Sequence, residues 1–216
     1  MHPEVARLRA RFSSVVESED EIRAVSGNVT PRAAVKEVTV VDEMSRRFIA
    51  ASPFIFIGSV GKGGAMDVSP KGDPAGFVRV LDEKTLAIPD RLGNKRFDTF
   101  QNLLVNPAIG LIFIVPGIDW TLRVTGQGVI VRDEALRQDL AERGRPPEHV
   151  LVVAVESVMS HCPKCMIRSG LWRPEDWPDI SDVPSLAETI KVHGKIADPV
   201  EDVAAGLAAS VRDRLY

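Results

Sequence analysis

The sequence has only two cysteines, no excess of basic residues and no long hydrophobic run. Two cysteines in 216 residues cannot form a disulfide framework. The 27 lysines and arginines are outnumbered by 30 aspartates and glutamates, so we expect no nucleic-acid partner. The longest apolar run, 108–116, is far shorter than the roughly 20 residues of a membrane-spanning helix, so we expect no membrane partner. The first residues lack the pattern of a secretory signal, and we expect a cytoplasmic protein.

Familiar catalytic motifs are also missing from the sequence. There is no phosphate-binding GxxxxGK[ST] loop, no GxGxxG after a strand, no HExxH and no GxSxG. No side chain can be named as a general acid or base, so the catalytic residues are unknown at this stage.

The remaining composition is that of an ordinary globular protein. Hydrophobic residues make up 44% and charged residues 26%, which excludes disorder over most of the chain. Single β-rich domains often exceed about 200 residues. We therefore expect one domain, 1–216, with a core at about 50–160 and helical extensions at both ends.

Helical signals precede the predicted core. Apolar residues at helical spacing predict an amphipathic helix through Val5, Leu8, Phe12 and Val15. Thr30 followed by Pro31 predicts a helix start, with a capping hydroxyl and a proline at the first helical position. Asp42 can cap a further helix, which Pro53 would end.

The middle of the sequence has the character of a β-sheet. Seven segments are rich in β-branched, aromatic and apolar residues: 54–60, 65–71, 77–81, 85–89, 109–115, 120–131 and 150–158. A predicted helix at 95–105 separates the fourth strand from the fifth, and a short helix at 133–143 precedes the last. Gly126 and Gly128 inside a strand indicate a bulge or a barrel corner. Because most connections are hairpins, the pattern predicts a closed antiparallel barrel of six or seven strands.

The first candidate site is Asn94-Lys95-Arg96, at the start of the predicted helix 95–105. The N–H groups in the first turn of a helix lack partners, and the helix dipole is positive there. Two cations at this place oppose helix stability unless an anion binds. The residues alone leave two interpretations open, a phosphate site and a solvated turn with two surface cations.

The second candidate is the segment 69–74 (SPKGDP), where a predicted strand ends. Pro70 removes a hydrogen-bond donor from the strand, which is unusual inside a sheet. Either this stretch faces a ligand in place of a neighbouring strand, or it is an edge or a bulge.

The third candidate is the pair Cys162 and Cys165, which follows His161. A CxxC pair can be a redox site or half of a zinc site. A structural zinc site needs four ligands, and no spaced histidine pair completes one; the βαβ setting of a thioredoxin-like protein is also missing. The other interpretation is two small residues where a helix begins after a strand, and we predict no metal site.

The fourth candidate is Arg168 with Trp172. Arg168 lies at a predicted helix end, where a cation is expected in any case. Trp172 could pack on an aromatic ligand or serve as an anchor in the core or in an interface.

Three segments, taken in order, resemble the FMN-binding split-barrel family of pyridoxamine 5′-phosphate oxidase-like proteins, in its subgroup of FMN-dependent enzymes. They are SPKGDPAGFVRVLDEKTLAIPDRLGNKRFDTFQNLLVNPAIGLIFIVPG (69–117), TLRVTGQGVIVRD (121–133) and HCPKCMIRSGLW (161–172). The likeness covers roughly 40–175. It implies a mainly β fold with flanking helices, a six-stranded antiparallel split barrel, and a homodimer with FMN at the subunit interface.

The resemblance also implies a set of cofactor-binding residues. The strand along the flavin falls on Asp67, Val68, Ser69, Pro70 and Lys71. The phosphate falls on Lys95 and Arg96, with Asn94 beside them, and backbone contacts fall near Ile88 and Pro89. A contact from the other subunit falls on Thr121, and a C-terminal contribution falls on Arg168 and Trp172.

The function implied by the resemblance is that of an FMN-binding flavoprotein. Such a protein would act as an oxidoreductase that transfers a hydride between flavin N5 and a small organic substrate or a nicotinamide. Met66 stands where pyridoxine-phosphate oxidases carry an arginine, so we do not expect vitamin B6 phosphate as the substrate. The alternatives are a non-catalytic binder of flavin, deazaflavin or haem in the same groove, and a dimer linked by zinc at Cys162 and Cys165.

Overall fold

The computed structural model describes residues 2–216, which divide into two compact units with the boundary between Lys36 and Glu37. The first unit contains three short helices, α1 (Pro3–Arg9), α2 (Glu19–Ser26) and α3 (Pro31–Ala34). None of these helices has a buried residue. The helix start at Thr30 and Pro31 is confirmed, because the Thr30 hydroxyl accepts a hydrogen bond from the N–H of Ala33. The predicted helix through Val15 is wrong beyond Arg9, where α1 ends. That 1–216 forms one domain stays a prediction.

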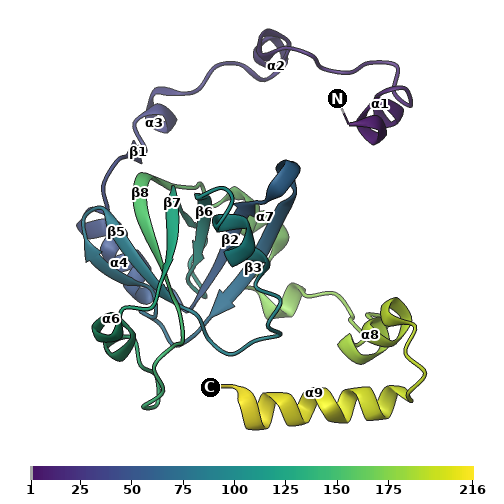
Figure 1. Cartoon of the computed structure of the whole chain (residues 1–216). Coiled ribbons are helices and arrows are strands. Elements are labelled where there is room, and N and C mark those ends of the chain that lie inside the picture. The colour runs from purple at the N-terminus through teal and green to yellow at the C-terminus, as the bar shows by residue number, and fades with distance from the viewer. Residues whose placement is uncertain (1) are drawn as a thin grey trace. The chain divides into compact units, whose positions relative to one another are not determined.

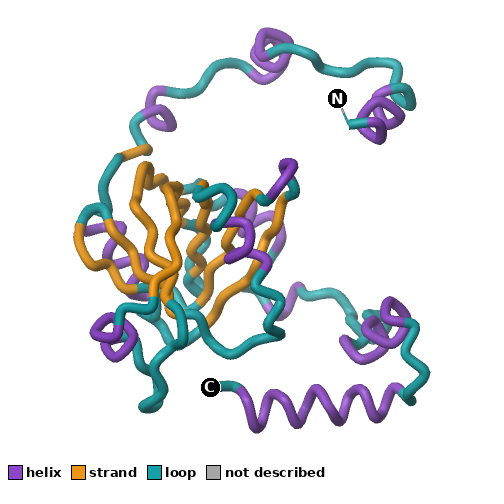
Figure 2. The backbone as a smooth tube through the Cα atoms, in the orientation of Figure 1, coloured by secondary structure: helices purple, strands orange, loops and turns teal. Residues whose placement is uncertain are grey.

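The second unit is built on a curved antiparallel sheet of eight strands (Figures 1 and 2). The strands follow the order β3-β2-β6-β7-β8-β5-β4, and β1 pairs with β8. Their bounds are β1 (Glu37–Val38), β2 (Phe54–Val60), β3 (Met66–Gly72), β4 (Arg79–Asp82), β5 (Thr85–Pro89), β6 (Ala108–Ile114), β7 (Leu122–Val131) and β8 (Val150–Ser160). The seven predicted strands are confirmed with small shifts at their ends. The eighth, β1, has two residues, too few to show a period in the sequence.

The closed barrel of six or seven strands that the sequence pattern predicts is wrong in closure and in strand number, and the six strands implied by the family resemblance are too few. Among residues 2–216, no ladder joins β3 to β4, so these two strands are edges. β4 has only four residues, and its pairing with β5 shifts register between Val80 and Asp82. Gly76 adopts a positive φ of 86° between the two edge strands, so the chain turns there and does not extend a ladder. What holds of the prediction is a mainly antiparallel β fold with flanking helices.

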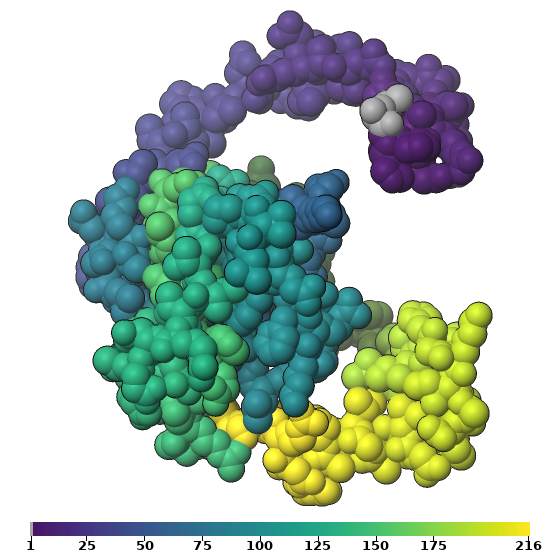
Figure 3. All heavy atoms as spheres, viewed as in Figure 1, coloured from purple at the N-terminus to yellow at the C-terminus, as the bar shows by residue number. Residues whose placement is uncertain are grey.

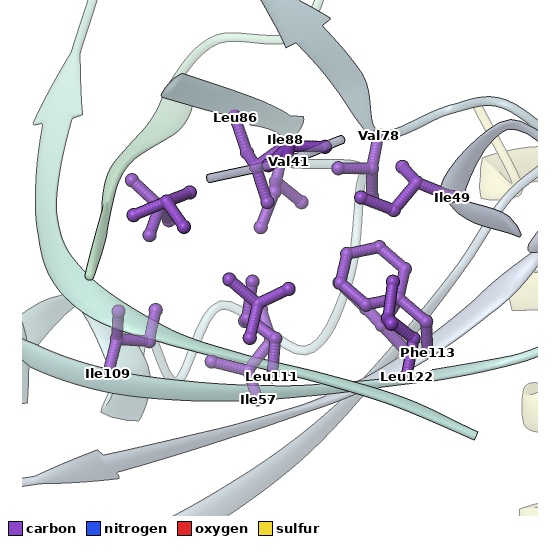
Figure 4. Packing of buried hydrophobic residues seen from close by; sticks show 14 of the residues in the cluster. Val41, Ile49, Ile57, Val78, Leu86, Ile88, Ile109, Leu111, Phe113 and Leu122 are labelled. Carbon is purple, nitrogen blue, oxygen red and sulfur yellow. The ribbon is translucent and has the colours of Figure 1, made fainter. Parts of the chain in front are cut away.

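The hydrophobic core fills the concave side of the sheet. Figure 4 shows side chains from β2, β5, β6 and β7 converging with Ile49 and Val78. The largest of the almost fully buried side chains are aliphatic or aromatic: Phe113, Ile49, Ile55, Ile57, Leu86, Ile88, Leu111, Val124, Val150, Val153 and Val158. The predicted bulge is confirmed at Gly126, where the register of β7 against β8 shifts; a Cβ atom there would lie 2.0 Å from the carbonyl oxygen of Ala154.

Short helices close the ends of the sheet and extend beyond it. They are α4 (Glu43–Ala51), α5 (Asp98–Leu103), α6 (Glu134–Asp139), α7 (Lys164–Ser169), α8 (Leu186–Gly194) and α9 (Val200–Arg214), with 3₁₀ turns η1 (Lys62–Gly64) and η2 (Pro174–Asp176). The predicted cap of α4 is confirmed, because Asp42 accepts from the N–H of Ser45 at 2.8 Å. The helix predicted at 133–143 ends four residues early, before Arg143 and Gly144, which both have positive φ. Among residues 2–216, no helix combines the length and apolar character that a bilayer crossing requires.

Candidate functional site

One pocket of about 610 Å³ brings several predicted site residues together. Its walls come from β3, from the loop and helix start that follow β5, from the loop before β8, and from residue 216. The lining residues are Asp67, Val68, Ser69, Pro70, Lys71, Asp90, Arg91, Leu92, Gly93, Asn94, Lys95, Arg96, Phe97, Asp98, Thr99, Phe100, Arg145, Pro146, Pro147, Glu148, His149 and Tyr216. Segments separated by about twenty residues, 67–71 and 94–96, therefore share one cavity.

Strand β3 supplies the first wall because it continues the sheet with polar residues. Ser69 pairs with Ile57 across the β2–β3 ladder, and Lys71 pairs with Ile55. Paired residues point to the same face of a sheet, so the face that is apolar and buried in β2 becomes polar in β3. Pro70 lies in an edge strand, where a missing N–H leaves no partner unsatisfied. The interpretation of this stretch as an edge is confirmed, and the edge borders the pocket. That the stretch faces a ligand stays a prediction.

An ion pair between Lys71 and Asp90 lies in the pocket wall. Lys71 Nζ is 3.6 Å from Asp90 Oδ1, and the Asp90 side chain is only 14% exposed. Burial raises the pKa of Asp90 above its ordinary value, and the charges of Lys71 and His149 oppose that rise. Burial and these two neighbours therefore act on the pKa of Asp90 in opposite directions.

A second carboxylate, Asp73, ties the loop after β5 to the rest of the pocket. Its side chain is 2% exposed, and its Oδ2 atom lies 2.5 Å from Arg91 Nε. Arg91 also donates to the carbonyl oxygen of Leu140 at 2.9 Å. Asp73 and the carbonyl oxygen of Leu140 both bind the Arg91 guanidinium. Arg91 therefore holds the loop after β5 in place, and its charge is compensated by Asp73. Sequence reasoning missed Arg91 because its partner lies 18 residues earlier.

The loop 94–96 differs from its prediction. Helix α5 begins at Asp98 and not at Lys95, because Lys95 and Phe97 adopt left-handed φ values of 60° and 58°. The Asn94 side chain accepts from the N–H of Arg96 at 3.1 Å, a local bond that competes with the helix. The argument from a helix N-terminus is therefore wrong, and any anion here would meet loop side chains.

The two cations of this loop are not equivalent. Arg96 Nε lies 2.7 Å from Asp98 Oδ2, with 71% and 40% of the two side chains exposed. Lys95 is exposed and has no ion pair within residues 2–216. Lys95 is thus a cation without a compensating carboxylate at the pocket.

The imidazole ring of His149 borders the same pocket and packs against two phenylalanine rings. Its ring centroid lies 5.8 Å from that of Phe100 and 6.3 Å from that of Phe97, both in edge-on geometry. The Nδ1 atom of His149 is buried and has no hydrogen-bond partner within the described residues. Sequence reasoning missed His149, because no local pattern shows that the loop before β8 folds over α5.

Five predicted cofactor residues do not line this pocket. Ile88 is 2% exposed in the core, and Pro89 is buried at the end of β5, next to Asp90. Thr121 is 8% exposed, and its carbonyl oxygen accepts from the N–H of His161. Arg168 is exposed in the last turn of α7, and Trp172 Nε1 donates to the carbonyl oxygen of Ile118 at 3.0 Å. One copy of the chain does not bring these residues to the pocket.

The two cysteines lie where a helix begins after a strand. Cys162 and Cys165 are exposed free thiols beside the start of α7, just after β8. Within residues 2–216, no group of three or more His, Cys, Asp or Glu side chains could hold a metal ion.

Comparison with solved structures finds several similar chains, each at low sequence identity. HupZ from Group A Streptococcus is 19% identical, with a TM-score of 0.46, over 55% of this chain and 92% of its own. A Clostridium acetobutylicum protein related to general stress protein 26, of the pyridoxinephosphate oxidase family, is 15% identical, with a TM-score of 0.41. The match covers 57% of this chain and 94% of that protein. An FMN-binding protein from Syntrophomonas wolfei is 10% identical, with a TM-score of 0.42. The match covers 55% of this chain and 89% of that protein. Comparison with functionally curated proteins gives no match.

A family model covers β2 to β8 and most of the pocket. The model described as pyridoxamine 5′-phosphate oxidase matches residues 41–162, more than half of the 216 residues. The matched range begins just before α4 and ends just after β8. It contains every lining residue of the pocket except Tyr216. The chain belongs to the pyridoxamine 5′-phosphate oxidase family.

Proposed function

We propose that the protein binds FMN in the pocket beside β3. We further propose that it acts as a homodimeric oxidoreductase, transferring a hydride between flavin N5 and a small organic substrate or a nicotinamide. The observation that carries this proposal is the meeting of 67–71 and 94–96 in one cavity. The family resemblance assigns the first segment to the flavin ring and the second to its phosphate, and family membership supports that assignment.

The loop 94–96 suits a phosphate group. Lys95 has no ion pair in the described residues, and Arg96 is held only by the surface partner Asp98. Exposed ion pairs contribute roughly 0–1 kcal/mol, whereas a charge-assisted hydrogen bond to an anion contributes about 1.5–3 kcal/mol. A doubly negative phosphate would therefore compete well for Arg96 and engage Lys95 as well.

The rest of the pocket suits a flat polar ring. Its volume of about 610 Å³ falls in the range of roughly 300–1,000 Å³ that is usual for ligand sites. The free edge of β3 offers backbone N–H and C=O groups that pair with no other strand in the described residues. FMN would supply the hydride chemistry when bound, and the protein would supply position and electrostatics.

The residues around the pocket have positioning roles in this proposal. Lys71 places its ammonium group in the pocket wall formed by β3, where the ion pair with Asp90 positions it. Arg91, held by Asp73, stiffens the loop that carries Lys95 and Arg96. Thr121, Arg168 and Trp172 lie outside the pocket of their own chain, so their proposed contacts require a second copy.

The decisive experiment compares flavin uptake by two double variants. Lys95→Ala with Arg96→Ala is expected to weaken FMN binding by roughly 10²-fold or more, because two charged contacts are lost. Arg32→Ala with Lys36→Ala removes two exposed cations from outside the pocket and serves as the matched control. FMN fluorescence quenching measures affinity, circular dichroism checks the fold, and light scattering measures the oligomeric state.

Several outcomes would contradict this proposal. Equal FMN affinity in both double variants would remove the phosphate assignment. A purified protein with a Soret band would favour haem, and a deazaflavin spectrum would favour that cofactor. Flavin that binds but is reduced by neither NADH nor NADPH nor any organic donor would favour a non-catalytic binder.

A further inference from the structure

Residue 216, far from the sheet in sequence, forms part of the pocket wall. Tyr216 lines the cavity together with β3 and the loop before β8. It is half-buried, and it follows helix α9, none of whose residues is buried. In the space-filling view, the yellow end of the chain lies against the green loop before β8 (Figure 3).

The hydroxyl of Tyr216 is bound to the carboxylate that supports the pocket loop. Tyr216 Oη donates to Asp73 Oδ1 at 2.9 Å, while the other oxygen of Asp73 contacts Arg91. Asp73 thus links the C-terminal segment, β3 and the loop after β5. This hydrogen bond is the main reason why the pKa of Tyr216 is raised, since ionisation would place a second negative charge beside Asp73.

Two arginines of the loop before β8 hold the same residue from the other side. The guanidinium carbon of Arg143 lies 4.6 Å from the centre of the Tyr216 ring, within the range of a cation–π contact. Arg145, itself a lining residue, donates to the carbonyl oxygen of Tyr216. Residue 216 is therefore held by its hydroxyl, its ring and its backbone.

The segment that leads to Tyr216 has few other attachments. Helices α8 and α9 pack mainly on each other, and of their residues only Ala187 is buried. The contacts at residue 216 are thus the main tie between this segment and the pocket. Segments with few buried contacts open at low free-energy cost.

We propose that Tyr216 is a movable wall of the pocket and that its release from Asp73 admits and frees the ligand. The identity of the ligand, FMN, rests on the proposed function. While Tyr216 is docked, its ring covers part of the cavity and stabilises the loop 90–96 through Asp73 and Arg91. When it is released, the cavity opens on that side.

The first test needs no ligand. Tyr216 is the only tyrosine in the sequence, so 3-fluorotyrosine gives a single ¹⁹F resonance that reports on this residue alone. We expect that resonance to differ from its position in urea and to move toward it in Asp73→Asn. Amide hydrogen exchange over 90–100 should be about tenfold faster in Tyr216→Phe, the loss expected for one hydrogen bond to a charged group. Leu215→Ala, at an exposed neighbouring position, should exchange like the wild type.

The second test measures ligand release. FMN dissociation, followed by recovery of its fluorescence on dilution, should be about tenfold faster in Tyr216→Phe and at least as fast in Tyr216→Ala. Unchanged exchange over 90–100 in both variants, or release within twofold of wild type, would overturn the movable wall. A wild-type protein that takes up no FMN would instead refute the proposed function, and the exchange measurement would still decide the role of Tyr216.

Discussion

Strands β2 and β3 are neighbours in one ladder, yet they have opposite roles. On the concave face of β2, Ile55, Ile57 and Ser59 are at most 1% exposed, and the two isoleucines belong to the hydrophobic core. Their partners on β3 are Lys71, Ser69 and Asp67, which remain partly exposed and line the pocket. The hydrophobic core thus ends at β2, and the candidate site begins at its neighbour β3, the edge strand of the sheet. The difference shows that one strand pairing can place a polar wall beside a core without a separate domain.

The largest expected effect tests the core half of this comparison. Ile57→Ala should lower the free energy of unfolding by about 2–5 kcal/mol, because it leaves a cavity in a packed interior. Ser69→Ala, at the position paired with Ile57, should change it by no more than about 0.5 kcal/mol. Chemical denaturation of the two variants measures the difference. Similar losses in both would mean that β3 belongs to the core and does not form a separate wall.

A smaller effect concerns the titration of Asp90 in the pocket wall. Burial raises the pKa of Asp90 above 3.8, so the native state keeps this proton to a higher pH than the unfolded chain. The contribution of Asp90 to stability is therefore greatest below pH 3.8 and is lost as the pH rises through its native pKa. Lys71→Met should raise that pKa further, because the ion pair opposes the effect of burial.

Carboxyl ¹³C NMR measures this titration directly. Asp179 provides an internal comparison, since hydrogen bonds from Ser181 lower its pKa. Lys71→Met should leave the midpoint of Asp179 unchanged. If the midpoint of Asp90 lies at or below that of Asp179, the pocket wall is more solvated than its 14% exposure indicates.

The same contrast explains what the sequence could and could not predict. The run of apolar, β-branched and aromatic residues in β2 and the caps at Thr30 and Asp42 are local signals, so the corresponding elements are confirmed within a residue or two. The helix start at Lys95 was predicted wrongly, because the left-handed backbone at Lys95 and Phe97 depends on one side chain, Asn94, and on tertiary packing. The prediction that the barrel closes is also wrong, because the residues of an edge strand do not indicate whether it pairs with the other edge strand of the sheet.

The parts of the site that sequence reasoning missed involve long-range contacts. Asp73 and Tyr216 are separated by 143 positions, and Arg91 and Leu140 by 49. His149 reaches the pocket only because the loop before β8 folds beside α5. In contrast, the predicted residues of β3 and of the loop 94–96 each belong to a short continuous segment, so the family resemblance could carry them over together.

The smallest expected effect distinguishes the two cations of the loop 94–96. Asp98 engages Arg96 at 2.7 Å in an exposed ion pair, and a bound phosphate would have to compete with it. Asp98→Asn should therefore strengthen FMN binding by about two- to fivefold, the modest gain expected when an exposed ion pair no longer competes with the phosphate. The gain should vanish in an Arg96→Ala background and persist in Lys95→Ala, as a double-mutant cycle with fluorescence titration at low salt would show. If Asp98→Asn weakened binding instead, Asp98 would be holding Arg96 in place for the phosphate and not competing with it.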